Sequence, residues 1–64
     1  MPEHAVYEAY YRDEKGNEHE LGAVTAESEE EARHLLPRQI EQMFGHEERL
    51  KWEHFGPRVR RAET

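Results

Sequence analysis

The stretch SEEEARHLLPRQIEQMFG, residues 28–45, decides how this chain folds, because it has the features of one amphipathic helix from beginning to end. Ser28 is a favourable N-cap, and Glu31 follows at the spacing of a capping box. Apolar side chains recur at helical spacing and predict one buried stripe: Ala32, Leu35, Leu36, Ile40, Met43 and Phe44. Gly45 is a natural residue to end the helix. We therefore expect a helix over residues 29–44.

Pro37 lies inside this helix, where proline removes a hydrogen bond and costs about 3 kcal/mol. Either one helix is kinked at Pro37, or a first helix ends near Leu36 and a second one begins with Pro37. The apolar pattern crosses Pro37 without a change of phase. This continuity favours a single kinked helix.

Two strands precede the helix and form a hairpin. Residues 5–12 are rich in tyrosine and contain a valine, as strands are, and residues 18–26 form the returning strand. The connection over residues 13–17 ends in a Gly-Asn pair, which is typical of a short turn. Gly22 inside the second strand indicates a β-bulge.

A third strand is predicted at residues 50–55, where Leu50 and Trp52 alternate with charged side chains. The Gly-Pro pair at 56–57 ends it, and residues 60–64 are expected to be a frayed tail.

The order of elements predicts an α+β fold of ββαβ type. We expect a three-stranded antiparallel sheet in the order 2-1-3, with one Pro-kinked helix packed on one face. The alternative order, 1-2-3, pairs the second and third strands in parallel. Either order leaves one sheet face without a helix and two strand edges open to pairing with another chain.

With 64 residues the chain is expected to form one domain, residues 1–64, with a small core. It has no cysteine to form a disulfide, and only 34% of its residues are hydrophobic. Oligomerisation is the common remaining way to stabilise so small a core. We therefore expect a homodimer, formed through strand edges or through the open sheet face.

The net charge of −6 argues against nucleic acid as the main partner. No segment has the length and apolarity of a membrane span or the pattern of a signal peptide, so the expected location is cytoplasmic. High charge with few asparagine and glutamine residues is compatible with thermal stability of the kind seen in thermophiles.

Histidine and glutamate are adjacent at several places, among them residues 19–20, 46–47 and 53–54, but none of these three pairs has the spacing of a metal-binding motif. The chain has no cysteine nucleophile and no glycine-rich phosphate loop, and Ser28 is explained as a helix cap. We therefore expect no metal, no cofactor and no catalytic residue, and a protein that is not an enzyme.

The strand and helix around AVTAESEEEAR, residues 23–33, are loosely similar to several ββαβ families. Among these are a small ribosomal protein of the archaeal large subunit and the small non-catalytic subunit of bacterial phenylacetyl-CoA epoxidase. The likeness rests on the residues Val24, Ala26, Ser28, Glu31 and Ala32. Any capped helix that follows a strand shows these residue types, so no functional residue is transferred from either family.

Two functions follow from these observations. The first is a non-catalytic interaction or accessory module that self-associates. The alternative is weak RNA binding, in which a basic C-terminal segment acts beside sheet aromatics. The residues considered for an interface or binding site are Tyr7, Tyr11, Trp52, Arg58, Arg60 and Arg61. The acidic chain favours another role for these arginines, which is to pair with the glutamates at the start of the helix.

Overall fold

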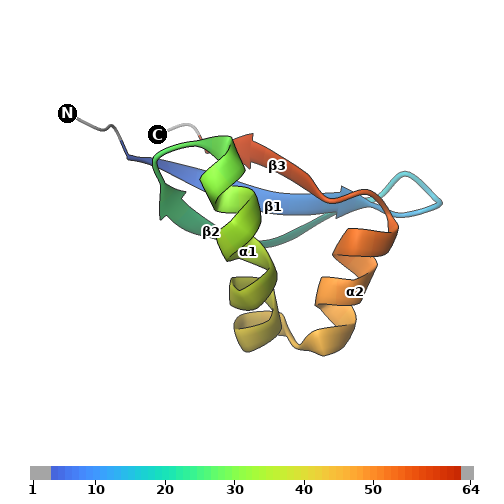
Figure 1. The fold of residues 1–64 in the computed structure, drawn as a ribbon. Helices are drawn as coiled ribbons and strands as arrows, with labels where there is room; N and C mark the ends of the chain where they lie inside the picture. Colours follow the sequence, from blue (N-terminus) through green and yellow to red (C-terminus); the bar gives the residue numbers. More distant parts are fainter. Residues whose placement is uncertain (1–3, 63–64) are drawn as a thin grey trace.

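A computed structural model describes residues 4–62, whose path is shown in Figure 1. The elements in chain order are β1 (Ala5–Arg12), β2 (Glu18–Ala26), α1 (Glu29–Phe44), α2 (His46–His54) and β3 (Arg58–Arg61). The three strands form one antiparallel sheet in the order β2-β1-β3. The predicted α+β class, antiparallel pairing and central position of the first strand are confirmed.

The β1–β2 ladder contains the bulge that Gly22 predicted. Glu8 pairs with Ala23 and Tyr10 with Glu20, so Ala9 alone lies opposite two residues of β2. Gly22 has a φ of +98°, which a residue with a side chain rarely adopts. The bulge brings Leu21 into the core, where it is buried.

Helix α1 begins as the sequence predicts. The Ser28 hydroxyl accepts a hydrogen bond from the Glu31 backbone N–H at 3.1 Å. The helix continues through Pro37 as one element and ends at Phe44, so the alternative of a helix that restarts at Pro37 is wrong. Ala32, Leu36 and Ile40 are its buried residues, one on each successive turn.

The third strand predicted at residues 50–55 is wrong, because residues 46–54 form a second helix, α2. Only one side chain of this segment, Trp52, is buried, so the apparent alternation did not reflect a half-buried strand. Glutamate, arginine, leucine and lysine favour a helix. Side-chain pairs one turn apart support it: Arg49 with Glu53 at 3.1 Å and Lys51 with Glu48 at 3.3 Å.

The third strand lies further along the chain, in β3, so the prediction of a frayed tail is wrong for Arg60 and Arg61. Val59, opposite Ala9 of β1, supplies the buried side chain of this strand. The Ala62 N–H continues the ladder with a 2.8 Å hydrogen bond to the Val6 carbonyl. The rest of the predicted tail, residues 63–64, lies outside the described residues.

Both helices lie on the same side of the sheet, so the molecule has two layers (Figure 1). The core between these layers consists of Ala9, Tyr11, Leu21, Ala26, Ala32, Leu36, Ile40, Trp52 and Val59. Phe55, just after α2, stacks on Tyr11 with ring centroids 5.5 Å apart. Helix α2 therefore covers the end of the sheet that α1 leaves open.

Candidate functional site

The aromatic residues considered for binding belong to the covered side of the sheet. Tyr11 and Trp52 are buried, and Tyr7 is half-buried against the core. The Trp52 indole donates a 3.2 Å hydrogen bond to the Arg58 carbonyl, which ties α2 to β3. These three rings do not form an exposed stacking surface with the arginines.

The arginines lie on both faces of β3. Arg58 and Arg60 pair with Tyr10 and Glu8 of β1 and share the open face with them. Arg61 pairs with Tyr7 and shares the helix-covered face. The three arginines therefore do not form one basic patch.

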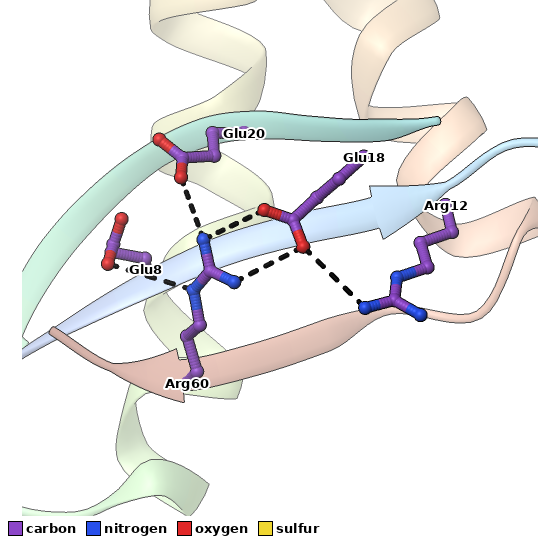
Figure 2. Close-up of polar contacts among 5 residues, drawn as sticks. All are labelled: Glu8, Arg12, Glu18, Glu20 and Arg60. Carbon is purple, nitrogen blue, oxygen red and sulfur yellow. Dashed lines mark hydrogen bonds and ion pairs between the residues drawn. The ribbon is translucent and has the colours of Figure 1, made fainter. Parts of the chain in front are cut away.

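Arg60 lies at the centre of an ion-pair network on the open face of the sheet (Figure 2). Its guanidinium donates to both Glu18 oxygens, at 3.2 and 3.0 Å, and to Glu20 at 2.7 Å. Glu8 is 3.8 Å from Arg60 Nε, and Arg12 lies 3.9 Å from Glu18. The expected pairing of the C-terminal arginines with the glutamates at the start of α1 is therefore not the one found for Arg60.

This network engages the Arg60 cation within its own chain. The hydrogen bond with Glu18 raises the pKa of Arg60 above its ordinary value, with further support from the charges of Glu8 and Glu20. The guanidinium also lies 4.4 Å from the centroid of the Tyr10 ring. A cation that donates to two carboxylates of its own chain and lies 3.8 Å from a third is poorly placed to bind a phosphate.

Replacing Arg60 with glutamine is expected to lower the melting temperature at neutral pH. Glu8, Glu18 and Glu20 then face one another without the cation that joins them. Differential scanning calorimetry at low and high salt measures the effect, and the deficit should shrink in high salt because salt screens the repulsion. A deficit that is the same at both salt concentrations would contradict this account.

Two carboxylates, Asp13 and Glu41, pair with histidines elsewhere on the surface. Asp13 Oδ2 is 2.9 Å from His19 Nε2, and Glu41 Oε1 is 2.6 Å from His46 Nδ1. These hydrogen bonds lower the pKa of Asp13 and the pKa of Glu41 below their ordinary values. Within residues 4–62, no three histidine, aspartate or glutamate side chains come together as a metal-ion site would require.

Lowered carboxylate pKa values predict loss of stability in acid. A carboxylate whose pKa is lower in the folded chain stabilises the fold above its unfolded pKa, and this contribution is lost as the pH falls through the folded pKa. The urea midpoint should therefore fall below about pH 4. Asp13→Asn combined with Glu41→Gln should make the urea midpoint fall less in acid. If the midpoint of this variant falls as steeply as that of the wild type, the two pairs do not contribute to stability.

The two outer strands differ in how their free edges are protected. β3 carries arginine at three of its four positions, and charged side chains discourage pairing with another strand. The first half of β2 carries Glu18, His19 and Glu20. Its second half, Ala23–Ala26, has no charge and no proline. This second half is the unprotected part of the sheet edge.

The direction of the backbone groups on this edge follows from the ladder. The Val6 carbonyl bonds to Ala62, so the polar backbone groups of Val6 face β3. These groups alternate sides along an antiparallel strand, so those of Tyr7 face β2. In β2, the groups of Val24 therefore face β1, while those of Ala23 and Thr25 face outward.

A shallow groove of about 450 Å³ runs along this edge. Its lining comprises Ala23, Val24 and Thr25 of β2 and Leu35, Arg38, Gln39 and Gln42 of α1. Val24 points to the helix layer, whereas Ala23 and Thr25 point to the open face. A groove that contacts all three passes over the free backbone of the strand. We call it the edge groove.

The edge groove combines features of a strand-binding site. Outward backbone donors and acceptors are available at Ala23 and Thr25, and Leu35 beside them is 45% exposed. Arg38 is the charged residue of the lining and makes no ion pair within residues 4–62. The groove contains no nucleophile held by a base, so its chemistry is that of binding.

The sequence did not identify the edge groove. The sequence predicted two open strand edges, but it placed Leu35 in the buried stripe of α1 and did not single out the uncharged run after Gly22. The assignment of Leu35, Met43 and Phe44 to the buried stripe is wrong, because all three side chains are exposed and the buried residues of α1 are Ala32, Leu36 and Ile40.

Comparison of the chain with protein-family models, curated proteins and solved structures finds no significant match. Within residues 4–62, no helix has the length and apolar character needed to cross a membrane.

Proposed function

We propose that this chain is a non-catalytic interaction module that self-associates by adding a strand of a second copy to the free edge of β2. The observation that carries the proposal is the unprotected edge at Ala23–Ala26, with its outward backbone groups under the edge groove. Strand addition gives these groups hydrogen-bond partners and covers Leu35.

Self-association through the other surfaces has less support. Pairing of β3 with its own copy brings Arg58, Arg60 and Arg61 against the same three residues, which repel one another. The open face is occupied by the Arg60 network, whose groups are already paired within one chain. The β2 edge has neither obstacle.

The variant Thr25→Pro tests this proposal. Proline removes the outward N–H of Thr25, a group that takes no part in the ladder with β1. We expect Thr25→Pro to be a monomer by sedimentation velocity at a concentration where the wild type is a dimer. Circular dichroism establishes that the variant is folded, and Thr25→Lys provides a second edge-blocking change if it is not.

Val6→Lys is the matched control. Val6 lies directly opposite Thr25 on the same face but on the central strand, and it is already 37% exposed. This change adds a charge without touching the free edge, so the dimer should persist. A dimer that survives Thr25→Pro, or that is lost in Val6→Lys alone, would overturn the β2 edge as the interface.

A further inference from the structure

We infer that the second copy pairs with β2 about a two-fold axis at Thr25, which places Arg38 of each chain beside the partner's Glu31. This inference rests on the proposed self-association and specifies its register. It assigns to Arg38 the role of selecting that register.

The backbone limits the possible registers to a few. Within the uncharged half of β2, hydrogen-bonded pairs between two copies must join residues whose polar groups face outward, and these are Ala23 and Thr25. Antiparallel pairing of β2 with its own copy can therefore place the axis at Ala23, at Thr25 or midway between them, at Val24. The side chains above the edge must decide between the three.

Helix α1 moves with β2, so the axis that relates the strands also relates the helices. α1 starts just after the end of β2 and runs back along it, until the Phe44 ring meets Gly22, 3.1 Å from the position of a Cβ there. The Leu35 end of the edge groove therefore lies toward Thr25, and the Gln42 end toward Ala23. The two α1 helices of a dimer lie antiparallel above the joined strands.

Charge complementarity selects the axis at Thr25. The stripe of α1 that lines the groove continues one turn back from Leu35 to Glu31. With the axis beside Thr25 and Leu35, Arg38 on one side meets the partner's Glu31 on the other. The axis at Val24 brings Arg38 close to the partner's Arg38, and the axis at Ala23 brings it to the uncharged Gln42 of the partner subunit.

Arg38 and Glu31 are both free to form this ion pair between the two chains. Arg38 is exposed and has no ion pair within residues 4–62. Glu31 uses Oε1 to accept a hydrogen bond of 3.3 Å from the Glu27 N–H, and its second oxygen has no hydrogen bond among those described. The same axis packs Leu35 against its copy, which covers an apolar side chain that is 45% exposed in one chain.

Single cysteines test the register, because the chain has no cysteine of its own. An axis at Thr25 sets the two Thr25 Cα atoms about 5.5 Å apart, within the range that a disulfide bridges. The two Ala23 residues are then about 13 Å apart along the strands. Under mild oxidation Thr25→Cys should give a covalent dimer, whereas Ala23→Cys and Val24→Cys should not.

Charge variants test the selecting contact. Arg38→Glu should raise the dimer dissociation constant at least about tenfold, because two ion pairs are replaced by repulsion. Glu31→Gln should weaken the dimer less, since glutamine can still complete the helix cap. Arg58→Glu is the matched control: Arg58 is exposed, has no ion pair within residues 4–62, and should change the constant less than about twofold.

The outcomes separate this inference from the proposed function. If the wild type is a dimer but Ala23→Cys or Val24→Cys cross-links, or Arg38→Glu and Arg58→Glu change the dissociation constant equally, the register is overturned and self-association stands. A wild type that stays monomeric throughout overturns both.

Discussion

Replacing Trp52 with alanine is expected to destabilise the protein by about 3–5 kcal/mol, the range for removal of a buried aromatic side chain. Trp52 is only 2% exposed and is the largest fully buried side chain of the described residues. Its indole N–H also holds the Arg58 carbonyl at 3.2 Å. A small domain has about 5 kcal/mol of stability or less, so this variant should be largely unfolded at 25 °C.

Urea unfolding followed by circular dichroism at one protein concentration measures this effect. Trp52→Phe keeps most of the volume and loses the hydrogen bond, so its cost should be smaller, about 1–2 kcal/mol. Leu50→Ala on the same helix is the matched control, because Leu50 is 46% exposed and its loss should cost less than about 0.5 kcal/mol. A folded Trp52→Ala variant with the wild-type midpoint would show that α2 does not hold the sheet.

Replacing Gly22 with valine is expected to cost about 2–4 kcal/mol, for two reasons that add. The φ of +98° strains any residue with a side chain, and most strongly a β-branched one. A Cβ at this position also lies 3.1 Å from Phe44 Cε2 and 3.8 Å from Cζ. The valine side chain would therefore occupy the space of the Phe44 ring at the end of α1.

A double-mutant cycle with Phe44→Ala separates the two reasons. Removing the ring relieves the contact but leaves the backbone strain, so Gly22→Val should cost less in the Phe44→Ala background and still cost about 1 kcal/mol or more. Gly16→Val is the matched control for strain alone. Gly16 has a φ of +86°, and nothing lies within 4 Å of the position of its Cβ. Equal costs at both glycines would show that the contact with Phe44 has no effect on stability.

The helix and the hairpin could be predicted because each carries local signals that agree. Ser28 gives the start of α1, the spacing of Ala32, Leu36 and Ile40 gives its buried face, and Gly45 gives its end. The order β2-β1-β3 also followed, because a short hairpin and a return across the sheet leave few arrangements. The helix and the hairpin depend on residues close together in the chain.

Helix α2 and strand β3 could not be predicted in the same way. One buried side chain per element, Trp52 in α2 and Val59 in β3, is too little to define a periodicity. The propensity of Glu47 to Lys51 for a helix was the available signal, and the alternation of Leu50 with Trp52 concealed it. Packing against Tyr11 and Ala9, distant in sequence, fixes both elements.

The candidate site depends still more on the tertiary structure. Arg60 was singled out from the sequence, but its partners Glu18 and Glu20 lie some forty positions earlier and meet it only across β1. Tyr11 and Trp52 were considered for an interface or binding site, but both are buried, so they give the RNA-binding alternative no exposed stacking surface. The edge groove required the position of α1 over β2.

The alternative function, weak RNA binding, can be tested directly. Arg58 is exposed on the open face, but its neighbour Arg60 is engaged by three glutamates, and the whole chain has a net charge of −6. We expect no binding of a fluorescent single-stranded RNA at 50 mM salt, where electrostatic association is strongest. Binding that weakens steeply with salt would instead favour the alternative function.

The mass of the wild-type protein in solution tests the central proposal most directly. Light scattering across a concentration series from about 1 µM to 1 mM spans the affinities expected of a small interface. We predict a mass that reaches twice the 7.7 kDa of one chain and stays there as the concentration rises, because a two-fold pairing of β2 edges is closed. A mass of one chain throughout the series would contradict self-association, and a mass that keeps growing would contradict the closed pairing.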